Sequence, residues 1–469
     1  MQRHVAFCED TTLKLYRYRP IKSALLELAD GTFYFADRRE LNDPIEGYAK
    51  IFFQGDRPAW QGLLKNFVCS LFYNLQTYLL MTKNFGGARE DFLQDLRNRV
   101  VLINLRHFDR SPLQKIFAEL GEKFLCEREV QSVVEFYGDA QIKCFGKEIE
   151  FVLRAVTDNA CHLCVEKCKS LGLIADDFDE KFFDVAYEIS FDELKNFPDR
   201  ERRRYIEEIE NLNCDALESG LMSLKLNPRD LRDPRRELKQ RFLRLKIFFP
   251  RMYVKQLKEI MYPDGYVVCF SRTPTDSSMW GNYADNHRGV CFIYETENLD
   301  GREFMNFAAR LLEVEPIKYD AQVMEQNFFD ALKHLKFLQA EDWLTGMNGA
   351  RSFKLDEFDA ADAYDGVYRE KFYRKLPAWR HEQEHRIFLA DEFYRYSDPF
   401  TRKIRYDSHA LTGIVFGLRT SLDDKTELIQ RLVRLKKSVH DFEFFQAEFD
   451  DETQTISVRE KFLLIKNLE

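Results

Sequence analysis

Residues 379–389 read Trp-Arg-His-Glu-Gln-Glu-His-Arg-Ile-Phe-Leu, so that a Glu-x-Glu pair runs into an apolar, strand-like segment. Residues two apart on a β-strand point to the same face, so we expect Glu382 and Glu384 to direct two carboxylates into one space. Carboxylates a few ångströms apart shift each other's pKa, as in enzymatic acid–base pairs. A solvent-exposed strand edge is the alternative, because 32% of the chain is charged. We expect Arg386 to pair with a neighbouring carboxylate.

Strand-like segments lie on both sides of a long helical stretch. Alternating or apolar runs predict strands, and amphipathic runs predict helices. The expected strands are residues 13–18, 32–36, 266–271, 289–294, 314–319, 410–417, 442–449 and 457–465. The expected helices outside the long stretch are residues 21–29, 322–344, 360–374 and 423–437.

Between about residues 59 and 262, amphipathic stretches dominate and Gly and Pro are sparse. This order of elements predicts an α+β fold split by a large helical insertion. We therefore expect residues 1–58 plus 263–469 to form one α+β core domain. Residues 59–262 would form the helical insertion domain.

The bulk composition indicates a globular chain with a large core. Of 469 residues, 45% are apolar and 14% aromatic, and the formal net charge is −9. No apolar run reaches the length of about 18 residues that a membrane span needs, and the N-terminus lacks the apolar core of a signal peptide. We therefore expect a cytoplasmic protein without a membrane contact.

The segment Arg229–Lys258 is strongly basic. A basic helical face can bind phosphates, which would make this segment a contact for nucleic acid or for a protein. The alternative is a solvated face that pairs with the acidic stretch 176–210.

Ten Cys are present, and Cys161, Cys164 and Cys168 have the spacing of one helical face. A zinc site would need a fourth ligand, and no matching Cys-x-x-Cys follows. We therefore expect buried helical cysteines and no metal.

Three segments combine polar and aromatic residues with apolar strands: Tyr16–Arg19 with Asn42–Gly47, then Ser271–Gly289, and then 379–386. In the second segment, the spacing of Trp280, Tyr283 and His287 predicts one face of a helical turn that ends at Gly289. Such a face could line a pocket for a flat ring, or it could simply be part of the core.

In their order and joint presence, these segments resemble the bacterial domain of unknown function 2971 family, related to abortive-phage-resistance proteins of the AbiGi type. The shared pieces lie within about residues 13–50 and 265–420. They include Leu15–Arg19, Asn42–Glu46, Cys269–Ser271, Met279–Tyr283, His287–Cys291, Ile317–Tyr319, Trp379–Arg386 and Ile414–Gly417.

The layout of this family is similar to that of ADP-ribosyltransferases, which implies a mixed or antiparallel sheet and NAD as substrate. The resemblance implies a first strand with Arg17 or Tyr18, a second with Ser271, and a later one with Glu382 and Glu384. Glu384 would stabilise an oxocarbenium-like transition state, and Glu382 would serve the acceptor. The remaining implied NAD-binding residues are Asn42, Asp43, Trp280, Tyr283 and His287.

Three functions stay open. The first is an NAD-dependent ADP-ribosyltransferase-like effector of bacterial antiphage defence. The second is a non-catalytic ligand-sensing or protein-interaction module. The third is a metal-dependent nuclease, in which Asp43, Glu46, Glu382 and Glu384 would hold Mg²⁺. No Gly-x-Gly-x-x-Gly or Walker motif points to a Rossmann or P-loop site.

Overall fold

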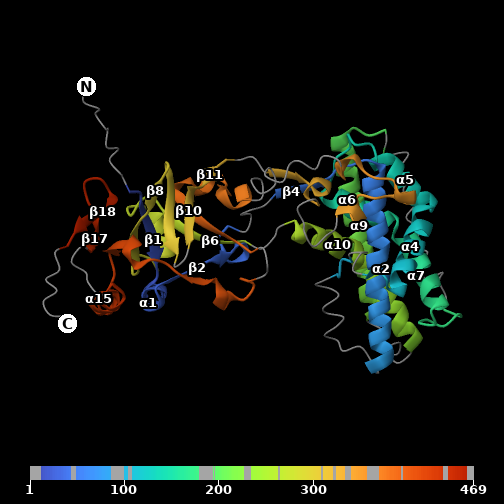
Figure 1. Ribbon diagram of the computed structural model, residues 1–469, viewed down its shortest axis with the longest axis horizontal. Helices are drawn as coiled ribbons and strands as arrows, with labels where there is room; N and C mark the ends of the chain where they lie inside the picture. Colours follow the sequence, from blue (N-terminus) through green and yellow to red (C-terminus); the bar gives the residue numbers. More distant parts are fainter. Residues whose placement is uncertain are drawn as a thin grey trace. The chain divides into compact units, whose positions relative to one another are not determined.

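The computed structural model divides the chain into two compact units (Figure 1). Unit 1 comprises Met1–Tyr48, Pro263–Val323 and Gly366–Glu469, and unit 2 comprises Ala49–Tyr262 and Met324–Asp365. The structure describes residues 12–43, 49–85, 100–103, 108–178, 194, 196–225, 234–261, 265–307, 310–320, 324–332, 340–355, 369–391, 395–436 and 442–461. Residues 49–58 and 324–365, which we expected in the α+β core, thus lie in unit 2.

Unit 1 is built on one large sheet, so the fold is α+β. The strand order is β18-β17-β16-β7-β1-β6-β14-β10-β9-β8, and β3 also pairs with β6. In the described part of the chain its neighbours are antiparallel, apart from the parallel pair β16–β17. The bounds are β1 Lys14–Arg19, β3 Ala36–Asp37, β6 Gly265–Ser271, β7 Val290–Glu295, β8 Glu297–Leu299, β9 Arg302–Phe307, β10 Arg310–Pro316, β14 Glu384–Ala390, β16 Leu411–Phe416, β17 Glu443–Asp450 and β18 Thr455–Glu460.

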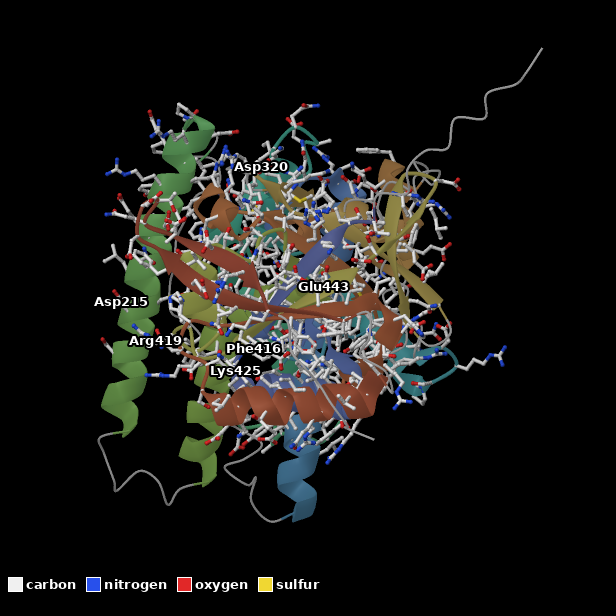
Figure 2. All side chains as sticks on the ribbon, turned by 90° about the vertical axis from the view of Figure 1, so that its left-hand side faces the viewer. Asp215, Asp320, Phe416, Arg419, Lys425 and Glu443 are labelled. Atoms are coloured by element: carbon white, nitrogen blue, oxygen red, sulfur yellow. The ribbon has the colours of Figure 1, made fainter. Side chains whose placement is uncertain are left out.

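One face of this sheet is covered by the helices α1 (Ile21–Asp30) and α15 (Leu422–Lys436), which lie side by side (Figure 1). Apolar side chains such as Phe292, Ile387 and Leu428 form the core beneath them. Figure 2 shows Lys425 of α15 beside Phe416 of β16, with the ammonium nitrogen 5.5 Å from the ring centroid.

The opposite face carries a small apolar cluster and the charged residues of the candidate site. On the central strand β6, Ser271 lies opposite Glu384 of β14 and opposite Tyr16 of β1. Directly opposed residues share a face, so Tyr16, Ser271 and Glu384 point to the same side. Short elements complete unit 1: β2 Thr32–Tyr34 paired with β15 Lys403–Arg405, β11 Lys318–Tyr319 paired with β13 Arg374–Lys375, and α11 Ser277–Tyr283.

Unit 2 is mainly helical and has its own apolar core. The long helix α2 (Arg57–Phe85) contributes buried residues such as Trp60 and Phe67. The other long helices are α4 Pro112–Leu125, α5 Arg128–Tyr137, α6 Gly146–Ala155, α7 Thr157–Ser170, α9 Asp199–Lys225 and α10 Pro234–Ile260. As expected, Cys161, Cys164 and Cys168 are buried on α7.

Unit 2 also contains a three-stranded sheet in the order β12-β4-β5, which the sequence did not predict. Its strands are β4 Ala49–Phe53, β5 Cys144–Phe145 and β12 Met324–Asn327. The helix expected over 322–344 is therefore wrong at its start, because residues 324–327 pair in parallel with β4. Backbone pairing with a distant strand overrides a local amphipathic pattern.

Some predictions lie partly outside the described residues. The helix expected over 360–374 is described only from residue 369 onward, and for the basic segment Arg229–Lys258 the side chains are described only from Ile247 onward. Among the described helices, none is long and apolar enough to cross a membrane.

Candidate functional site

The Glu-x-Glu pair lies at the entrance to β14, but only its second member is on the strand. Glu382 is the last residue of the 3-10 helix η8 (Pro377–Glu382), and Gln383 adopts the left-handed conformation with φ 44°. Simple strand alternation is therefore the wrong explanation for the pair. Gln383 in its left-handed conformation joins η8 to β14. The carboxylates of Glu382 and Glu384, on either side of it, contact the same cation.

That cation is Lys375 on β13. Its Nζ lies 2.6 Å from Glu382 Oε2 and 3.1 Å from Glu384 Oε2. The three side chains are nearly inaccessible, with exposures of 4% for Lys375, 2% for Glu382 and 6% for Glu384. Sequence reasoning missed Lys375, because its local sequence does not distinguish it from a surface lysine.

Arg386 holds Glu384 from the other side, which confirms the expected pairing. Its Nε lies 2.6 Å from Oε1 and its Nη2 lies 3.0 Å from Oε2, so the guanidinium donates to both oxygens of Glu384. Its Nη1 donates to the carbonyl of Phe372 at 2.7 Å. Such a fork fixes the plane of the Glu384 carboxylate.

Tyr283 and Asn42 complete the cluster on the side of Glu382. The Tyr283 hydroxyl donates to Glu382 Oε1 at 2.6 Å, and the Asn42 side chain hydrogen-bonds to the same hydroxyl. Asp43, next along the chain, is buried, and its charge acts on Arg386.

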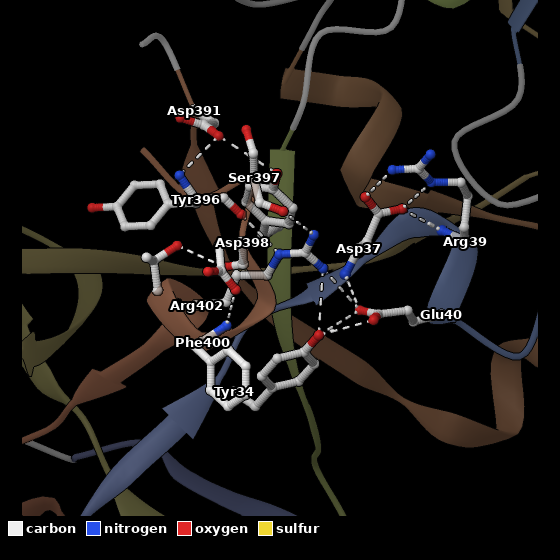
Figure 3. Close-up of polar contacts among 12 residues, drawn as sticks. Tyr34, Asp37, Arg39, Glu40, Asp391, Tyr396, Ser397, Asp398, Phe400 and Arg402 are labelled. Atoms are coloured by element: carbon white, nitrogen blue, oxygen red, sulfur yellow. Dashed lines mark hydrogen bonds and ion pairs between the residues drawn. The ribbon is translucent and has the colours of Figure 1, made fainter. Parts of the chain in front are cut away.

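A network of polar contacts lies just before Asn42 and Asp43 in the sequence (Figure 3). Asp37 and Glu40 form a capping box around the 3-10 helix η1 (Arg38–Glu40). The buried Arg402 donates to Glu40 at 3.2 Å and to the Tyr34 hydroxyl at 3.3 Å.

Burial is the main cause of the unusual electrostatics of this cluster. It raises the pKa of Glu384 to about 7, an effect that Lys375 opposes and Glu382 reinforces. For Lys375, burial lowers the pKa, but the charges of Glu384 and Glu382 outweigh burial and raise the pKa above its usual value. The two carboxylates therefore favour the charged form of Lys375, and Lys375 favours the ionised form of Glu384.

Ser271 and Tyr18 lie next to this cluster and share one acceptor. The Ser271 hydroxyl donates to the backbone carbonyl of Glu382 at 2.8 Å. The Thr273 carbonyl accepts from the Tyr18 hydroxyl at 2.7 Å and from Ser271 at 3.3 Å. Ser271 therefore positions the turn that carries Glu382, and its own hydroxyl is engaged.

Trp280 is fully buried, which corrects the idea that its ring faces a ligand. Its ring lies edge-on to Tyr18 at 5.0 Å and stacks on His287 at 6.4 Å, measured between centroids. The expected helical face is also wrong for His287, because α11 ends at Tyr283 and Asp285, Asn286 and His287 have positive φ. Trp280 thus belongs to the small apolar cluster against which Tyr283 packs.

Arg17 lies on the other face of the sheet and is not brought to the carboxylates. It is buried, and its Nε lies 3.3 Å from Glu27 Oε2 on α1. Its Nη1 donates to the Cys269 carbonyl at 2.8 Å. On β1, neighbouring side chains alternate between faces, so Tyr18 and Arg17 cannot both reach the site.

The expected nuclease site has no support among the described residues, which contain no group of three or more His, Cys, Asp or Glu arranged to hold a metal ion. One of its four proposed ligands, Glu46, lies outside them.

Comparison with known proteins identifies one similarity. Neither the curated proteins nor the solved structures give a match. Residues 279–387 match the model of the family described as "Protein of unknown function (DUF2971)". This segment runs from α11 to the middle of β14, so it includes Tyr283, Lys375, Glu382, Glu384 and Arg386. The match supports the domain of unknown function 2971 family for the part of the chain that carries most of the charged cluster.

Proposed function

We propose that this cluster binds NAD and breaks its bond between ribose and nicotinamide, with Glu384 as the catalytic carboxylate of an ADP-ribosyltransferase-like effector. The observation that carries the proposal is the meeting of Ser271, Glu382 and Glu384 at one point. Ser271 and Glu384 lie opposite each other on neighbouring strands, and Glu382 and Glu384 share one ammonium group.

The chemistry needs these groups in different tasks. The bond from ribose C1′ to the pyridinium nitrogen breaks, and nicotinamide leaves as a neutral base with the bonding electron pair. The positive charge that develops on the ribose is stabilised by the Glu384 carboxylate, whose orientation Arg386 fixes. An acceptor oxygen then bonds to C1′, and its proton passes to Glu382.

The energetics of the cluster favour a functional site over a structural one. Lys375, Glu382, Glu384 and Arg386 are all buried. An apolar core of the same volume is often as stable as a buried ion-pair network, or more stable. Carboxylates with strongly shifted pKa values are concentrated at functional sites, and the pKa of Glu384 is raised in this way.

A test uses NAD labelled in its ADP-ribosyl part, incubated with the protein and a bacterial lysate. We expect nicotinamide release together with transfer of label to a macromolecule. Glu382→Gln should reduce label transfer more than nicotinamide release, because its task is at the acceptor. An absence of both nicotinamide release and transfer with the wild-type protein would contradict the proposal.

One observation favours a second candidate, a non-catalytic ligand-sensing or protein-interaction module. Both oxygens of Glu384 are already engaged, by Arg386 and by Lys375. In that case NAD or a related ligand would bind and remain intact. A role in antiphage defence, implied by the family resemblance, is tested by phage survival assays in cells that express wild-type protein or Glu384→Gln.

A further inference from the structure

The surroundings of the Lys375 ammonium group resemble a binding site for an organic cation. Two carboxylates, those of Glu382 and Glu384, lie within 2.6 Å and 3.1 Å of Nζ. The indole ring of Trp379 lies on a further side, with its centroid 4.7 Å from Nζ. Trp379 belongs to η8, the same short helix that ends at Glu382.

This combination has a recognised chemistry. A cation over an aromatic face, with carboxylates nearby, is how proteins recognise organic cations. Within the chain, the ammonium group of Lys375 on β13 is that cation. The lysine ammonium is carried on a flexible stem of four carbons. The ammonium can therefore leave the two carboxylates while the backbone of β13 stays in place.

Trp379 is also the tryptophan placed to meet a ligand. It is half-buried, whereas Trp60, Trp280 and Trp343 are fully buried. The aromatic surface that sequence reasoning assigned to Trp280 is therefore better supplied by Trp379.

We propose that Glu382, Glu384 and Trp379 form a cation-binding cage that Lys375 fills from within the chain, and that the ligand group taken by this cage is a planar, positively charged ring. The choice of ring rests on the proposed function, because the nicotinamide ring of NAD carries a positive charge. Once the glycosidic bond breaks, nicotinamide is neutral and loses its attraction to the cage. Lys375 then returns to the carboxylates and assists product release.

The test compares two probes of nearly equal shape, the N1-methylnicotinamide cation and neutral nicotinamide. Binding is measured by equilibrium dialysis and by quenching of tryptophan fluorescence. Lys375→Ala removes the internal competitor, so we expect it to bind the cation about tenfold or more tightly than wild type does. Its affinity for nicotinamide should not change.

Two controls accompany this variant. Lys375→Arg keeps the positive charge and should bind the cation no better than wild type. Lys318→Ala removes an exposed lysine on the adjacent strand β11, which pairs with Glu370 at 3.4 Å, and should behave as wild type. A Lys375→Ala protein that binds both probes with equal affinity would overturn the proposal.

Replacement of Trp379 keeps the proposal testable if Lys375→Ala does not fold. In the wild-type background, Trp379→Phe should retain cation binding, and Trp379→Ala should lose it. Equal affinity of the two variants for the N1-methylnicotinamide cation would overturn the proposed cage. These measurements need no turnover, so they are separate from the proposed function. Selective cation binding without nicotinamide release would leave the cage standing and would remove the catalytic proposal.

Discussion

Arg386 is a buried partner of Glu384, so we expect its removal to destabilise the fold. Arg386→Ala would remove the guanidinium that contacts both oxygens of Glu384 and that donates a hydrogen bond to the Phe372 carbonyl. Breaking a buried pair in this way should lower the free energy of unfolding by about 3–5 kcal/mol. The control is Arg431→Ala, whose exposed helix pair with Glu427 at 3.4 Å should contribute about 0.5 kcal/mol or less. Equal losses in chemical denaturation would contradict the structural role of Arg386.

His385, between the two charged partners on β14, gives a prediction for pH. Burial lowers its pKa from 6.5 to about 4, and its Nδ1 has no hydrogen-bond partner among the described residues. The folded protein thus favours the neutral ring. This contribution to stability is fully present above pH 6.5 and is lost as the pH falls from 6.5 through about 4. Relative to His385→Gln, the wild-type protein should lose unfolding free energy over that range in denaturation curves. A constant difference between the two proteins would show that His385 does not titrate abnormally.

At the scale of elements, the turn that follows α11 and Tyr283 packs closely against the end of β1. Gly289 lies in this turn, and a Cβ there would meet the backbone oxygen of Arg19 at 2.2 Å. Gly289→Ala should therefore displace the turn and lower the melting temperature by several degrees, and it should weaken cation binding at the cage. Gly281→Ala is the matched control on α11, because a Cβ there meets nothing within 4 Å. Alanine is favoured over glycine in a helix by roughly 1 kcal/mol, so this variant should be neutral or stabilised. Similar losses in both variants would rule out the steric explanation.

Local sequence predicts elements well where their pattern is long and self-contained. The alternating segment before Arg19 forms β1, and the amphipathic run near the C-terminus forms α15. Prediction failed where a distant partner decides the conformation, as for β12, which reads as helix but pairs with β4. The site shows the same limit. The Glu-x-Glu pair could be found from its sequence, whereas Lys375 becomes significant only when β13 and the turn before β14 meet in space.

At the scale of the whole molecule, the chain leaves unit 1 twice, at Ala49–Tyr262 and at Met324–Asp365. Each unit has its own apolar core, so each should have its own stability. We expect Arg386→Ala to lower the midpoint of the unit 1 transition in scanning calorimetry. Gly62→Ala should lower that of unit 2, because a Cβ at Gly62 would meet the Trp343 carbonyl oxygen at 2.1 Å. A single transition that both variants shift equally would contradict independent units.

Nicotinamide release by Glu384→Gln tests most directly whether the Glu384 carboxylate acts on NAD. This variant keeps the shape of the side chain but removes the negative charge that the developing ribose cation needs. We expect nicotinamide release to fall by about a hundredfold or more relative to wild type, in a protein that is still folded by circular dichroism. Glu443→Gln is the control, since it removes an exposed carboxylate of β17 that pairs with Lys14 at 3.0 Å, and it should release nicotinamide at the wild-type rate. A folded Glu384→Gln protein that releases nicotinamide as fast as wild type would contradict the account.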